Sequence, residues 1–127
     1  MARSPDIEIY IKDAVLDHIQ NWLSQYFDGL ELRPMAHGHG WTGSALHDGM
    51  PIPISLFSEA AGKRYSCLVF DSNRTPWGSD LECARSAWQH LHTEIRCSTG
   101  GWQEGEDEEG GRWWRLDEQG EGQVNWQ

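Results

Sequence analysis

The segment DIEIYIK at residues 6–12 decides the fold, because apolar and polar residues alternate strictly along it. Residues two apart on an extended chain point to the same side, so Ile7, Ile9 and Ile11 share one face. A period of two in β-branched residues is typical of a strand with one face against the hydrophobic core. We therefore begin from this strand and ask which segments cover its isoleucines.

Two segments have the spacing of amphipathic helices. We expect Asp13 to cap the first helix, since a carboxylate at that position accepts from free backbone N–H groups. Its apolar stripe is formed by Val15, Ile19, Trp22, Leu23, Tyr26 and Phe27. The second helix begins at the capping box Ser79-Asp80-Leu81-Glu82. Its stripe is formed by Leu81, Ala84, Trp88, Leu91 and Ile95.

Three further segments predict strands. Residues 30–33 alternate, and residues 64–71 form a continuous apolar run, which is typical of a central strand. Residues 51–57 also indicate an extended segment. It should start at a sheet edge, because Pro51 and Pro53 cannot donate to a ladder on both sides. Residues 35–50, rich in Gly and His, predict a long loop.

The last 26 residues differ in composition from the rest. Residues 102–127 hold eight acidic residues and two arginines. Their ends, 112–116 and 123–126, predict a hairpin. We therefore divide the chain into an α+β core domain at residues 1–101 and an acidic, Trp-rich extension at residues 102–127 that packs on the same domain.

The predicted order of elements is β-α-β-β-β-α-β-β, which belongs to the α+β class. Two one-sided helices and several one-sided strands satisfy each other if both helices cover one face of an antiparallel or mixed sheet. A ferredoxin-like, split βαβ arrangement fits this order, with the C-terminal Trp-rich hairpin added to it. A chain of this length buries roughly two-thirds of its unfolded surface, so neither a disulfide nor a metal is needed for stability.

Charge limits the choice of partner. The 127 residues include 20 acidic and 10 basic ones, which gives a net charge of −10. Nucleic acids and anionic membranes attract proteins through clustered Lys and Arg, whereas this chain has two lysines and scattered arginines. We expect neither of them as a ligand. A basic protein partner would be attracted, and a second copy of the chain, giving a homodimer, is the other partner we consider.

We also expect a cytoplasmic protein with reduced thiols. No apolar run approaches the length of a membrane span, and the first residues lack the apolar core of a signal peptide. The three cysteines are odd in number and form no CxxC pair.

Surplus tryptophans and the acidic run indicate a protein-binding surface. Of eight Trp, six lie outside the helix stripes, and exposed Trp is enriched at interfaces. The alternative for the adjacent Trp113 and Trp114 is that the one facing away from the core packs under the return strand of the tail or stacks against Arg112 and Arg115. The predicted partner-binding residues are Trp41, Trp102, Trp113, Trp114, Glu106, Asp107, Glu108 and Glu109.

A rival hypothesis places a site in the loop at residues 37–48. His37 and His39 are separated by one flexible glycine and can reach a common zinc ion, with His47 or Asp48 as a third ligand. The alternative is a solvent loop in which His and Gly are simply tolerated. The chain has no G-x-S-x-G elbow, and we assign no catalytic residue. The sequence favours a regulatory or immunity-like binding protein without catalysis and without a cofactor. The alternative is a small enzyme or zinc-binding protein with its site in this loop.

Overall fold

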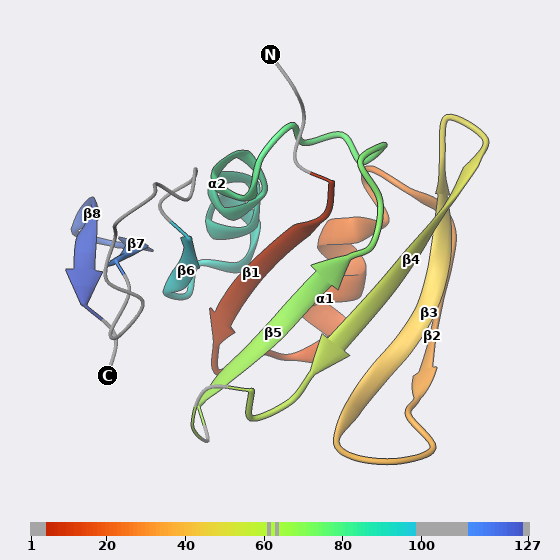
Figure 1. Cartoon of the computed structure of the whole chain (residues 1–127), viewed down its shortest axis with the longest axis horizontal. Coiled ribbons are helices and arrows are strands. Elements are labelled where there is room, and N and C mark those ends of the chain that lie inside the picture. Colours follow the sequence, from red (N-terminus) through yellow and green to blue (C-terminus); the bar gives the residue numbers. More distant parts are fainter. Residues whose placement is uncertain (1–4, 61, 63, 99–111, 126–127) are drawn as a thin grey trace.

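The structure is a computed structural model, and it describes residues 5–60, 62, 64–98 and 112–125 (Figure 1). Within these residues the chain forms two α-helices and one antiparallel sheet of eight strands, so the α+β class is confirmed. The elements are β1 (Ile7–Lys12), α1 (Leu16–Leu23), β2 (Asp28–Pro34), β3 (Gly40–His47), β4 (Met50–Phe57), β5 (Tyr65–Phe70), α2 (Asp80–Leu91), β6 (Ile95–Ser98), β7 (Arg112–Asp117) and β8 (Gly120–Asn125).

The strand order is β2-β3-β4-β5-β1-β6-β7-β8, and each neighbouring pair is antiparallel. The predicted ferredoxin-like order is not confirmed, because the strand order differs. One part of it is present: α2 connects β5 to β6, and β1 lies between these two strands, as in a split βαβ unit. The first helix departs from that pattern, because α1 leads the chain to β2 at the far edge of the sheet, and three antiparallel steps then bring it to β5, beside β1 (Figure 1).

Residues 35–50 are not one long loop, because β3 occupies Gly40–His47 and pairs with both β2 and β4. Gly43, one of the glycines in this segment, allows β2 and β3 to approach closely and does not form a turn. A Cβ atom built on Gly43 would lie 1.7 Å from the backbone oxygen of Glu31, so only glycine fits at this position of the strand pair.

β4 is an interior strand and not the predicted edge, since it lies between β3 and β5. Its two prolines are tolerated because β5 pairs only with residues 54–57, beyond both of them. The carbonyl of Pro53 still accepts a hydrogen bond from the Asp71 N–H (3.0 Å).

The two helices differ in how well the sequence predicts their ends. Asp13 does not cap α1: it has a positive φ of 51° and pairs with Arg64 (2.7 Å), and the N-cap position is Val15. The predicted cap of α2 is confirmed, because the Glu82 N–H donates to Ser79 Oγ (3.2 Å). α2 ends at a left-handed His92, so the predicted helical residue Ile95 lies on β6 instead.

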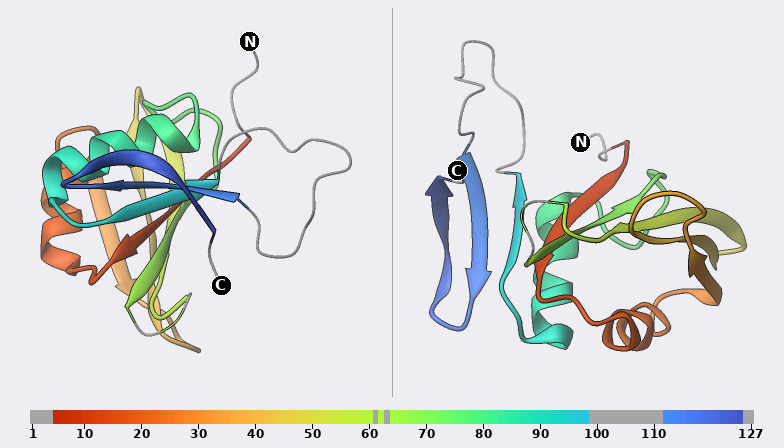
Figure 2. Two further views of the ribbon diagram at one scale, coloured as in Figure 1. Left: turned by 90° about the vertical axis from the view of Figure 1, so that its left-hand side faces the viewer. Right: turned by 90° about the horizontal axis from the view of Figure 1, so that it is seen from below.

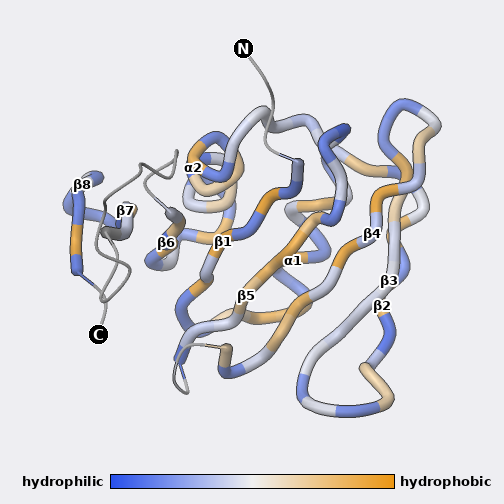
Figure 3. The backbone as a smooth tube through the Cα atoms, viewed as in Figure 1, coloured by the Kyte–Doolittle hydropathy of each residue, from blue (hydrophilic) through white to orange (hydrophobic). Residues whose placement is uncertain are grey.

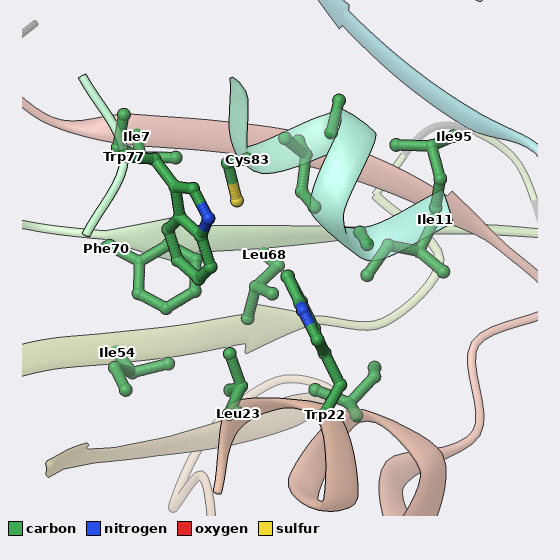
Figure 4. Packing of buried hydrophobic residues seen from close by; sticks show 14 of the residues in the cluster. Ile7, Ile11, Trp22, Leu23, Ile54, Leu68, Phe70, Trp77, Cys83 and Ile95 are labelled. Carbon is green, nitrogen blue, oxygen red and sulfur yellow. The ribbon is translucent and has the colours of Figure 1, made fainter. Parts of the chain in front are cut away.

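Both helices lie on the same side of the sheet (Figure 2), and the core fills the space between the layers (Figure 4). The three isoleucines of β1 are at most 1% exposed. β5, in the middle of the sheet, is hydrophobic along most of its length (Figure 3). From α1, Trp22 is buried and donates through Nε1 to Ser86 Oγ of α2 (3.0 Å), which ties the helices together.

Trp77 belongs to this core, although it lies in the connection between β5 and α2 and not on a helix or strand. It is 6% exposed and its ring lies 5.4 Å from that of Phe70 and 5.9 Å from that of Phe27. Among the residues described, no helix is long and apolar enough to cross a bilayer.

The packing predicts a strong difference between two neighbours on β5. Leu68 is fully buried under the helices, whereas Val69 is half-buried on the opposite face. Leu68→Ala should lower the free energy of unfolding by about 2–5 kcal/mol, as buried leucine truncations do. Val69→Ala should lower it by less than half as much. Urea denaturation measures both free energies of unfolding. Equal losses would show that the hydrophobic core does not lie against the face of β5 that carries Leu68.

Candidate binding site

A cavity of about 290 Å³ lies between α2 and the turn end of the β7–β8 hairpin. We call it the hairpin cavity. α2 provides one wall and the hairpin provides the other. The lining residues are Arg85, Trp88, Gln89, Leu116, Asp117, Glu118, Gly120 and Glu121. This volume is at the lower end of small-molecule pockets and suits a single side chain better than a whole ligand.

The floor and one wall of the hairpin cavity are apolar. Leu116 is buried and lies opposite Ile95 of β6 in the sheet. Trp88 is only half-buried, which corrects its predicted place on the buried stripe of the helix. The fully buried positions of α2 are instead held by the small residues Cys83, Ala84 and Ala87. Trp88 therefore stays at the surface of the core, where it lines the cavity.

The rim carries an ion pair that fixes the hairpin to α2. Arg85 Nη2 donates to Glu121 Oε1 (3.0 Å), and Trp114 Nε1 donates to the same oxygen (3.0 Å). The hydrogen bond from Arg85 lowers the pKa of Glu121, so this carboxylate is charged at neutral pH. Asp117 accepts from the Gln119 N–H (2.9 Å), while Glu118 is exposed. Of the three carboxylates in the lining, Glu121 pairs with Arg85 and Asp117 pairs with Arg115 (3.3 Å), so the charge that remains at the rim is the negative one of Glu118.

The two edges of the sheet are built differently. β2 has a register irregularity between Asp28 and Glu31, a left-handed Gly29 (φ 60°) and a terminal Pro34. Bulges, charges and proline are features that keep edge strands from pairing with other chains. β8, GEGQVN, is regular in register and has one charged residue, Glu121, which is already ion-paired. Within the part of the chain that the structure describes, β8 is thus the edge that lacks these protective features.

The register shows which backbone groups β8 presents outward. A two-residue turn joins Asp117 to Gly120, so these two residues form the hydrogen-bonded pair that closes the hairpin. Backbone groups of successive residues point to opposite sides of a strand. The N–H and C=O groups of Glu121, Gln123 and Asn125 therefore point away from β7, along the open edge.

The adjacent tryptophans of β7 lie on opposite faces of the sheet. Trp114 lies on the helix side with Glu121, whereas Trp113 meets Tyr10 edge-on, with ring centroids 5.3 Å apart. The face with Trp113 also holds Arg96, whose guanidinium lies 5.2 Å from the ring centroid of Tyr65. These side chains form a polar and aromatic cluster on the face of the sheet opposite to the buried isoleucines of β1.

Of the other predicted partner-binding residues, the structure describes only Trp41, which lies toward the opposite end of the sheet. Trp41 lies on β3, opposite Leu56, and packs half-buried against the core. Trp102, Glu106, Asp107, Glu108 and Glu109 lie outside the described residues.

The three predicted metal ligands are not brought together. His37 and His39 are exposed in the turn before β3, whereas His47 is the last residue of that strand. At 3.3 Å per residue, β3 separates His47 from His39 by more than about 20 Å. His47 donates through Nδ1 to the Tyr26 carbonyl (3.2 Å). In the described part of the chain, no group of three or more His, Cys, Asp or Glu side chains is placed to hold a metal ion.

The cysteines lie in the interior. Burial raises the pKa of Cys67 and of Cys97 to about 12, and it raises the pKa of Cys83 well above its ordinary value. All three thiols are free and protonated at neutral pH, so none of them is an activated nucleophile.

No protein-family model, curated protein or solved structure matches this chain. The residues of the site itself offer binding chemistry: an apolar wall, a negative rim and an unpaired strand edge. Sequence reasoning found the hairpin but missed Arg85, Trp88 and Glu121 as partners. No local pattern in the sequence links these three residues, because Arg85 and Trp88 lie on α2 and Glu121 lies on β8.

The ion pair at the rim predicts a pH-dependent effect. Glu121→Gln should make amide exchange in β8 about two- to fivefold faster at pH 7, because the hairpin loses its charged link to α2. A carboxyl whose pKa is lower in the folded than in the unfolded protein stabilises the folded state at pH values above its unfolded pKa, about 4.5. This stabilisation is lost as the pH falls through the lowered pKa of the folded state. The difference between the variant and wild type should therefore vanish in acid.

Glu118→Gln is the matched control, since it removes an exposed carboxylate from the same hairpin. Equal acceleration in both variants would show that the Arg85–Glu121 pair does not hold the hairpin.

Proposed function

We propose that this protein binds a partner protein by accepting an extended segment of that partner as a ninth strand beside β8. The observation that carries the proposal is the contrast between the two sheet edges: β2 is guarded by charges, a bulge and proline, whereas β8 is regular and nearly uncharged. Strand addition at such an edge is a recurring mode of peptide recognition.

The contacts of β8 supply both parts of this recognition mode. Glu121, Gln123 and Asn125 offer outward N–H and C=O groups for the main chain of the partner. The hairpin cavity lies beside the same strand on the helix side and offers a place for one side chain. Main-chain hydrogen bonds provide affinity in this mode, and side-chain pockets provide specificity.

The charge of the chain fits a basic partner. A net charge of −10 speeds the approach of a positively charged protein and disfavours nucleic acids and anionic membranes. Three buried, reduced thiols suit the cytoplasm, which is the location we propose. The function is regulatory binding, without catalysis.

Two alternatives have less support. A second copy could pair through β8, but two chains of −10 repel each other. A zinc site or small enzyme in residues 37–48 would have to work without His47, because β3 separates it from His37 and His39.

The proposal is tested with linear peptides selected from a random display library against the wild-type protein. Gln123→Pro removes one outward N–H of β8 without breaking the ladder to β7, because proline is tolerated at an edge when its nitrogen faces outward. It should weaken the selected peptides at least about tenfold in a fluorescence titration, since a proline there also obstructs the incoming strand. The matched control Gln123→Thr keeps the N–H and should bind like the wild type.

Three outcomes would overturn the proposal. The library yields no binder, the two Gln123 variants bind equally well, or light scattering shows that wild type dimerises in a way that Gln123→Pro abolishes. The last result would assign the edge to a second copy. Circular dichroism spectra of both variants confirm beforehand that the sheet is retained.

A further inference from the structure

We infer that the hairpin cavity receives a lysine or arginine side chain from the strand that pairs with β8. The inference rests on the proposed strand addition and names the chemistry of the segment that is added. Its basis is the position of the cavity relative to the open edge, together with the residues that line it.

The position follows from sheet geometry. A strand added to β8 lies about 4.8 Å from it and directs alternate side chains to the helix side. Gly120 and Glu121, at the start of β8, both line the hairpin cavity. At this end of β8 the residue that faces the helix side is Glu121, whose carboxylate is held by Arg85 and Trp114, so the side chain of the added strand enters beside it. A long side chain opposite this end of β8 is therefore within reach of Trp88.

The lining favours a long cation over other side chains. The half-buried indole of Trp88 offers a face for an aliphatic stem and for a cation–π contact. Arg85 is already neutralised by Glu121, and Asp117 pairs with Arg115 (3.3 Å), so the exposed carboxylate of Glu118 is the charge that leaves the cavity negative. An acidic side chain would be repelled there. A purely apolar one would remove water from the carboxylates without replacing its hydrogen bonds.

Charge complementarity extends beyond the cavity. Glu118 is exposed at the hairpin turn, with no hydrogen bond or ion pair among the described residues, and it can pair with the incoming cation. Asp117 is already bonded to the Gln119 N–H, so Glu118 is the carboxylate most available to a new partner. We therefore expect the recognised segment to be extended and to carry Lys or Arg on its helix-side face.

The test uses the peptides selected against the wild-type protein and weakened by Gln123→Pro. Each should contain a Lys or Arg, and replacing that residue by norleucine, or an arginine by citrulline, should weaken binding about tenfold, because a charged hydrogen bond is lost. Glu118→Gln should weaken the cationic peptides about two- to threefold and reduce their sensitivity to salt. Glu31→Gln, which removes an exposed carboxylate from the opposite edge, should change neither.

The outcomes separate this inference from the proposed function. If the neutral peptides bind as tightly as the cationic ones, or the selected peptides lack Lys and Arg, while Gln123→Pro still abolishes binding, strand addition stands and the cationic pocket is wrong. If Glu118→Gln and Glu31→Gln have equal effects, the attraction comes from net charge and not from the cavity. If Gln123→Pro and Gln123→Thr bind alike, both proposals fail.

Discussion

The pairing of β1 on both of its edges holds the rest of the structure together. β1 lies between β5 and β6, and thereby joins the β2–β5 half of the sheet to the β6–β8 half. Its isoleucines face the helices, and Ile11 lies opposite Ile95, which in turn lies opposite Leu116. A slip of one residue in this register would turn all these side chains to the other face. The floor of the hairpin cavity therefore depends on a strand more than a hundred residues earlier.

The same arrangement explains why the two ends of the sheet differ. α2 packs on β1, β6 and β7 and is tied to the hairpin through Arg85 and Glu121. The small residues Cys83, Ala84 and Ala87 hold its buried face, so Trp88 is left beside the hairpin and not beneath the helix. An open edge and a partly apolar cavity consequently lie side by side. At the other end, β2 has an irregular register and charged residues, which are typical of edge strands that do not pair with other chains.

Features that a short stretch of sequence determines were predicted well. The alternation around Ile9, the Ser79 cap and the C-terminal hairpin are all local. The errors arose where distant backbone decides the outcome. Gly43 lies in the segment that we predicted as a loop, whereas in the structure it allows the carbonyl of Glu31 to lie close to β3. Ile95 has the spacing of the helical stripe, but His92 ends the helix before it. The candidate site was missed for the same reason, since it joins α2 to a hairpin that follows it by more than twenty residues.

The central claim is that the sheet accepts a ninth strand at β8, and intermolecular nuclear Overhauser effects test it most directly. In a complex with a selected peptide, we expect contacts from the peptide backbone to the amide protons of Gln123 and Asn125, in the alternating pattern of a β-ladder. Peptide contacts confined to Tyr10 and Trp113, on the face that the helices do not cover, would contradict the account.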